Sequence, residues 1–120
     1  MIRRPDTPYG AYGRAQGSAL SLRQADSLAF SQAANLLEAC CGQSRPDVEA
    51  ALKRNLRLWT QVQRLLVPDS HPLPISLRAN LLSLSLFVDR QTVKALISGS
   101  AADVRPLIDI NREVALGLLG

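Results

Sequence analysis

The sequence predicts an all-α protein, an antiparallel four-helix bundle with a flexible N-terminal arm. Apolar residues recur every three or four positions in four segments, which is the period of one helix face. Alternating apolar and polar runs, the pattern of half-buried strands, are absent. Connections of roughly three to eight residues join the segments and favour antiparallel neighbours. The chain has 120 residues, the usual size of one domain, so we expect an arm over residues 1–18 and a single bundle domain over 19–120.

The arm and the first helix differ in composition. Residues 1–17 contain three glycines and two prolines and show no helical period, which is typical of a flexible terminus. A helix is expected from Leu22 to Cys41, with Ser21 available as its N-cap and Gly42 at its stop. Its inner face should consist of small and apolar residues, namely Leu22, Ala25, Ala29, Ala33, Leu36 and Cys40.

The second helix has the clearest pattern in the chain. It begins after the sequence Arg45-Pro46-Asp47 and ends before Pro68, because proline and the residue before it do not continue a helix. Six residues at strict four-three spacing form its expected inner face, namely Val48, Leu52, Asn55, Trp59, Val62 and Leu66.

The third helix carries two apolar faces. It should run from Ser76 to Ile97, with Pro74 near its start and Gly99 at its stop. One face combines Leu77, Leu81, Leu84, Val88 and Ala95, and the opposite face combines Ala79, Leu82, Leu86, Val93 and Ile97. Two interpretations remain open. Either neighbours surround this helix in the bundle, or its second face borders a groove or an oligomer contact.

The fourth helix is expected from Val104 to Leu119. Pro106 favours Asp103 over Ser100 as the N-cap, because the proline then takes the third helical position, where its missing N–H would have no partner. The expected inner face consists of Leu107, Ile110, Asn111, Val114 and Leu118.

Two asparagines, Asn55 and Asn111, interrupt apolar faces. A buried amide has up to four hydrogen bonds to satisfy, so these side chains either bond backbone carbonyls or each other and fix the helix register, or they contact a partner. Trp59 is likewise either a core residue or an anchor for a partner at a groove margin. The candidate partner-binding residues are Asn55, Leu58, Trp59, Val62, Leu82, Leu86, Val93, Ile108 and Asn111.

The sequence gives no sign of an enzyme. His71 is the only histidine and lies in a proline-rich connection, so it forms neither a metal site nor a nucleophile–base pair. No catalytic residue, cofactor, metal or small-molecule substrate is therefore predicted. The adjacent Cys40 and Cys41 are expected to be reduced thiols, since a disulfide between neighbours needs unusual backbone geometry.

Charge and hydropathy limit the location and the partners. The formal net charge is +4, with a pI near 9.7. Lys53, Arg57 and Arg64 line the side of the second helix opposite its apolar face, either as a phosphate-contacting ridge or as a solvated face. The longest nearly apolar run, residues 81–88, falls far short of the ~20 residues that cross a membrane, and no export signal is visible. We therefore expect a cytoplasmic protein without membrane contact.

Three stretches of the chain resemble a known family. They are Asn55-Leu56-Arg57-Leu58-Trp59-Thr60, then Leu73-Pro74 followed by Leu77-Arg78-Ala79, and the ending Leu107-Ile108-Asp109-Ile110-Asn111-Arg112 with Gly117-Leu118. Ala11-Tyr12 and the alanine-rich first helix extend the likeness over nearly the whole chain. In this order and spacing the chain resembles the FlaF family of flagellar biosynthesis regulators. Asp26 departs from the family pattern, which has glutamate there.

The resemblance implies a non-enzymatic cytoplasmic factor that is needed for flagellin production or secretion and acts alongside the translational regulator FlbT. It leaves two mechanisms open. In the first, the protein is a flagellin export chaperone, similar in role to the helical FliS chaperones, and a flagellin helix lies in an apolar groove beside the third helix. In the second, it regulates translation of the flagellin mRNA through FlbT or, as a lesser alternative, by direct RNA binding.

Overall fold

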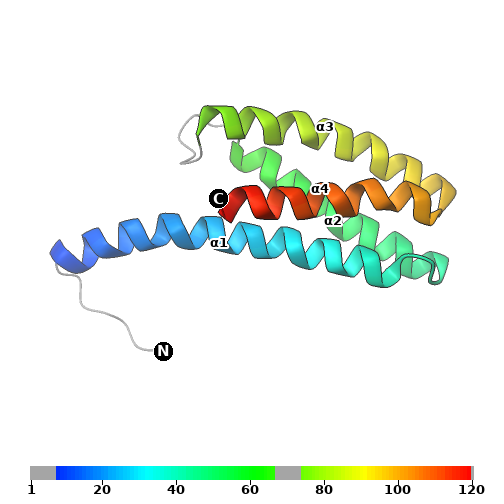
Figure 1. Ribbon diagram of the computed structural model, residues 1–120, viewed down its shortest axis with the longest axis horizontal. Coiled ribbons are helices and arrows are strands. Elements are labelled where there is room, and N and C mark those ends of the chain that lie inside the picture. Colours follow the sequence, from blue (N-terminus) through cyan, green and yellow to red (C-terminus); the bar gives the residue numbers. More distant parts are fainter. Residues whose placement is uncertain (1–7, 67–73, 120) are drawn as a thin grey trace.

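The four helices form an antiparallel bundle, as the sequence predicts (Figure 1). The computed structural model describes the backbone of residues 8–66 and 74–119 and the side chains of residues 24–64 and 74–119. The helices are α1 (Pro8–Cys40), α2 (Arg45–Leu66), α3 (Ile75–Ser98) and α4 (Ala101–Leu119). Each helix contacts its two neighbours around the bundle, α1 with α2 and α4, and α3 with α2 and α4. The pairs α1–α3 and α2–α4 therefore lie diagonally across the core.

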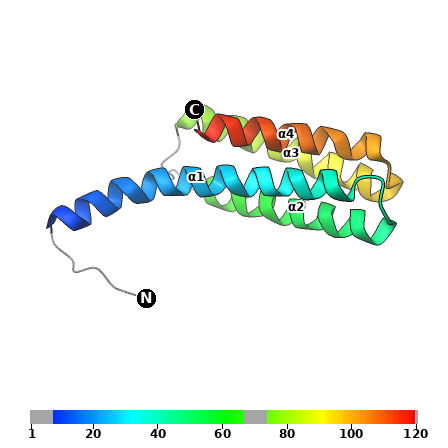
Figure 2. The same cartoon turned by 60° about the horizontal axis from the view of Figure 1, so that its bottom comes forward.

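The first helix begins earlier than the sequence predicts. It starts at Pro8 rather than at Leu22, so its backbone includes residues 8–18, which were assigned to the arm; residues 1–7 lie outside the described part. Proline suits the first helical position, and a glycine within a helix costs only about 1 kcal/mol relative to alanine. The glycines that suggested an arm therefore do not prevent a helix. Its first turns extend beyond the ends of the other helices (Figures 1 and 2).

The buried face of α1 is also rotated from the predicted one. Of the described residues in the predicted face, Ala33 is buried, Ala25 is exposed, and the other three are half-buried. The core instead receives Phe30 and Leu37, because burying these large side chains removes more apolar surface from water than burying alanines does. Among the described side chains of this helix, residues 24–40, the buried ones are Ser27, Phe30, Ala33, Ala34 and Leu37.

The fourth helix starts at Ala101, so the prediction of Asp103 as its N-cap is wrong. The carbonyl of Ser100 accepts hydrogen bonds from the N–H groups of Asp103 and Val104, at 3.1 and 3.2 Å. Pro106 consequently lies inside the helix. Its ring nitrogen leaves the carbonyl one turn earlier without a helical donor. That carbonyl belongs to an exposed residue near the helix start, where water can serve as the donor.

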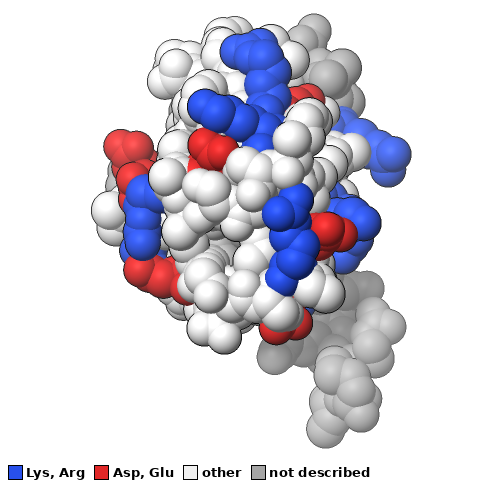
Figure 3. All heavy atoms as spheres, turned by 90° about the vertical axis from the view of Figure 1, so that its right-hand side faces the viewer, with Lys and Arg blue, Asp and Glu red and all other residues white. Residues whose placement is uncertain are grey.

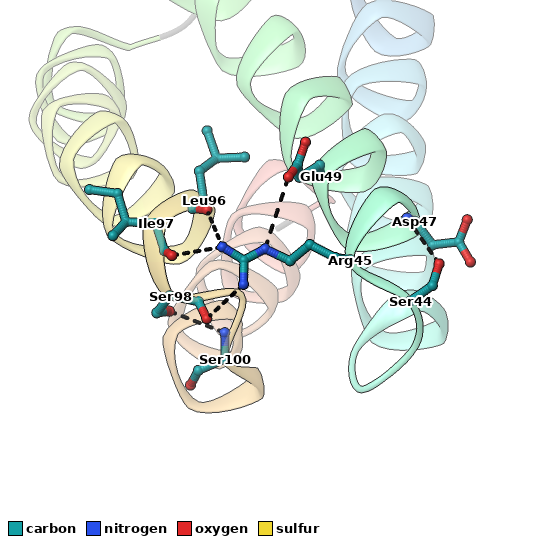
Figure 4. A network of polar contacts seen from close by, with 8 residues as sticks. All are labelled: Ser44, Arg45, Asp47, Glu49, Leu96, Ile97, Ser98 and Ser100. Carbon is teal, nitrogen blue, oxygen red and sulfur yellow. Dashed lines mark hydrogen bonds and ion pairs between the residues drawn. The ribbon is translucent and has the colours of Figure 1, made fainter.

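The C-terminus of α3 is fastened to the start of α2 by Arg45 (Figure 4). Gly99 ends α3 in the left-handed conformation, with φ 65°, and its N–H donates to the carbonyl of Ala95. The Arg45 guanidinium donates to the carbonyls of residues 96, 97 and 98, which are left free at the helix end, at 2.7 to 3.2 Å. Its positive charge also suits the negative end of the helix dipole. Glu49, at 3.9 Å, holds the guanidinium from the other side.

An ion-pair cluster joins α1 to α4. The Glu38 carboxylate accepts hydrogen bonds from Arg112 and, at 3.3 Å, from Arg105. The hydrogen bond and the charge of Arg112, followed by those of Arg105, lower the pKa of Glu38 below its ordinary value of 4.5. All three side chains are almost half exposed, so solvent and salt weaken the attraction between them.

Because of this cluster, we expect the stability of the fold to depend on pH. A depressed carboxyl pKa contributes stability above the unfolded-state pKa, and this contribution is lost as the pH falls through the lower folded-state pKa. We expect Glu38→Gln to unfold at lower urea concentration than the parent protein at pH 6, and the difference in midpoint to shrink below about pH 4.5. Urea unfolding of both proteins at pH 6 and below about pH 4.5 measures the difference in midpoint. A difference that stays constant with pH, or that persists unchanged in 1 M salt, would contradict the ion-pair origin.

Candidate functional site

A hydrogen-bonded chain of three side chains crosses the core between α2 and α4. The indole Nε1–H of Trp59 donates to Asn111 Oδ1 at 2.9 Å, and Asn111 Nδ2 donates to Asn55 Oδ1 at 2.6 Å. Phe30 from α1 meets the Trp59 ring edge to face, with ring centroids 5.1 Å apart. The interpretation that the two asparagines bond each other is confirmed. Because α2 and α4 are diagonal, these side chains set the axial register of two helices whose backbones are not adjacent.

The structure separates the candidate partner-binding residues into three groups. Four of them form the closed core and cannot touch a partner while the bundle is intact; these are Asn55, Trp59, Ile108 and Asn111, none more than 1% exposed. Three are half-buried, namely Leu58, Val62 and Leu82. Leu86 and Val93 are exposed on α3. Contact with a partner remains a prediction for the last two groups.

The second apolar face of α3 is not covered by the rest of the described chain. Leu86, Val93 and Ile97 are 58%, 54% and 74% exposed. The interpretation that neighbours surround α3 is therefore wrong, and the face is available to a partner. It is a ridge along one helix, and the charged side chains of Asp89 and Arg90 interrupt it.

A groove of about 480 Å³ runs between α3 and α4. Its apolar lining comes from Leu77, Leu81 and Leu84 on α3 and from Val114 on α4. Polar or backbone atoms line the remainder, contributed by Asn80, Ser83, Glu113 and Gly117. The sequence predicts an apolar groove beside the third helix but does not give its position between α3 and α4. Its one sequence signal was Gly117, a glycine inside a helical pattern, which often marks a close approach of another group.

A second groove lies between α1 and α2 and has a more polar lining. It measures about 370 Å³ and contains Arg54 and Arg57, one turn apart on α2. Neither arginine forms an ion pair within the described residues. Gln32 and Gln61 add further hydrogen-bond donors. The groove therefore offers donors to an anionic group.

Other site types lack structural support in the described part of the chain. No group of three histidine, cysteine, aspartate or glutamate side chains is arranged to hold a metal ion among the residues searched. Cys40 and Cys41 are free thiols, as expected. None of the described helices combines the length and apolar character needed to cross a membrane. His71 falls outside the described residues.

Comparison with known proteins gives one match. The family model described as flagellar protein FlaF matches residues 9–118, which is nearly the whole chain. The searches of curated proteins and of solved structures found no match.

Proposed function

Because this chain belongs to the FlaF family of flagellar proteins, we propose that it binds flagellin and serves as a cytoplasmic secretion chaperone for flagellum assembly. The observation that carries the proposal is the exposed apolar face of α3 together with the apolar lining of the α3–α4 groove. A contiguous exposed apolar patch, unlike a single exposed apolar side chain, marks an interaction surface.

The shape of this surface suits a helical client. An amphipathic helix buries its apolar face in a groove between two helices through anchors spaced three, four and seven residues apart. Covering such a face until export would keep an unassembled client from aggregating. The function needs no catalytic group, cofactor or metal.

A regulatory role is the second candidate. Arg54 and Arg57 in the α1–α2 groove, which pair with no described acidic residue, favour an anionic partner, either the flagellin mRNA or an acidic surface of FlbT. Direct RNA binding usually relies on a wide basic surface. At the end of the bundle seen in Figure 3, however, basic and acidic side chains are interspersed. The two arginines of the α1–α2 groove form a narrow basic surface, so we place the chaperone role first.

Calorimetry with purified monomeric flagellin at 50 and 300 mM salt separates the two roles. The chaperone role predicts micromolar or tighter binding that changes little with salt and shows a negative heat-capacity change, the marker of apolar burial. Binding of the flagellin mRNA that weakens steeply with salt, without any binding of flagellin, would replace it with the regulatory role. Binding of FlbT alone would favour the indirect route.

A further inference from the structure

Among the described residues, the side-chain hydrogen bonds between α3 and α4 lie near the turn of the hairpin. Near its turn, Gln91 Nε2 donates to the carbonyl of Asp103 at 2.7 Å, and the Asp103 carboxylate accepts from Ser98 and pairs with Lys94. From this turn the two helices separate toward the other end of the bundle (Figure 1). The groove lies at that open end, between residues 77–84 and 113–117.

Gly117 is a glycine that the fold itself does not require. It lies inside α4 without a positive φ, so its backbone conformation suits any residue. A Cβ placed on it would meet no atom within 4 Å, so no described neighbour occupies the space that its missing side chain leaves. Alanine would stabilise the helix at this position. A glycine at the wall of a groove does serve one purpose, which is to let another backbone approach closely.

The residues that line the groove indicate which kind of ligand it binds. The apolar residues form its floor, and Phe87, 38% exposed, continues the same side of α3 two turns beyond Asn80. Glu113 lies at the rim and makes no ion pair with any described residue. An elongated apolar floor with an unpaired carboxylate on one rim is complementary to an amphipathic helix that has basic residues along one edge.

We propose that the α3–α4 groove is the seat of an amphipathic flagellin helix, which crosses Gly117 with a small residue and places a basic residue beside Glu113. This proposal rests on the proposed function and locates its binding site. The outward face of α3 is the competing surface. It is a ridge on one helix, whereas the groove contacts a bound helix from two sides and so buries more of it.

Substitutions of Gly117 test the site with opposite effects on stability and binding. We expect Gly117→Ala to raise the melting temperature by about 2–4 °C. We expect the same substitution to weaken flagellin binding about fivefold or more, and Gly117→Leu to weaken it about tenfold or more, because the added atoms fill the seat. Calorimetry and thermal unfolding of the full chain measure both quantities. Ala50→Leu adds an exposed leucine on α2 and should leave binding unchanged.

The outcomes separate failure of the site from failure of the function. If the parent protein does not bind flagellin, both proposals are refuted. If it binds and the Gly117 variants bind equally well, the groove is refuted and the chaperone role survives. The double variant Leu86→Ser, Val93→Ser tests the competing face, and a loss of affinity there but not at Gly117 moves the site to that face. If Gly117→Leu changes only the oligomeric state in sedimentation, the occupant is a second copy and the proposal is wrong.

Discussion

Asn111→Ala is expected to lower the free energy of unfolding by about 3 kcal/mol, a large part of the roughly 5–15 kcal/mol that stabilises a domain. The substitution leaves two buried groups without partners, the indole N–H of Trp59 and Oδ1 of Asn55. Each unsatisfied buried group costs about 1–3 kcal/mol. Urea unfolding followed by fluorescence measures the loss, and the signal is specific because Trp59 is the only tryptophan.

A control and a double-mutant cycle make this prediction specific. Asn80→Ala removes the same amide from an exposed position on α3 and should change stability by no more than about 0.5 kcal/mol. Combining Asn55→Ala with Asn111→Ala should cost less than the sum of the single changes, since both remove the same hydrogen bond. Additive losses of stability would show that the two amides stabilise the bundle independently, which would contradict a hydrogen bond between Asn55 and Asn111.

Gly99→Ala is expected to lower the free energy of unfolding by about 2 kcal/mol, through two separate effects. The first is backbone strain, because a residue with a Cβ at φ 65° is in the unfavourable left-handed region. The second is a collision. The new Cβ would come within 2.7 Å of Arg45 Cζ and displace the guanidinium from the carbonyls at the end of α3. Urea unfolding measures the sum.

The two effects separate in the background of Arg45→Ala. With the guanidinium removed, Gly99→Ala should retain only its strain, about 1 kcal/mol. Gly42→Ala is a matched comparison, since Gly42 has φ 82° and an added Cβ there meets nothing within 4 Å. Gly42→Ala should lower the free energy of unfolding through backbone strain alone. If Gly99→Ala costs the same with and without Arg45, the close contact between these residues contributes nothing.

The sequence predicts well those parts of the fold whose structure depends on a few neighbouring residues. The end of α3 follows from Gly99, and the extent of α2 follows from a regular four-three spacing of core positions before a proline. The start of α1 could not be predicted by this reasoning, because glycine lowers helix propensity without excluding a helix. The N-cap of α4 was assigned wrongly, because the rule about Pro106 treats an exposed carbonyl near a helix start as though it needed a helical donor.

The candidate site depends on the distances between helices, and the spacing of apolar residues in the sequence does not predict these distances. Asn55 and Asn111 stand out in the sequence as polar interruptions of apolar faces. Only the packing shows that they bond each other and are hidden from any partner. The groove depends on how far apart α3 and α4 lie, and no motif in the sequence gives that distance. The rotated face of α1 likewise results from competition between Phe30 and the alanines for one core.

Because the side-chain hydrogen bonds between α3 and α4 lie near the turn, we expect the local stability of this hairpin to decrease from the turn toward its other end. Opening the helices near Gly99 breaks the hydrogen bonds that Asp103 forms with Gln91 and Ser98, whereas separating them near Gly117 breaks no side-chain hydrogen bond among those described between the two helices. We therefore expect small fluctuations to be largest at the ends of the helices farthest from the turn, where they would widen the hairpin without unfolding it. A ligand entering at that end would meet a structure that adjusts its width at little cost in free energy and keeps its shape at the turn.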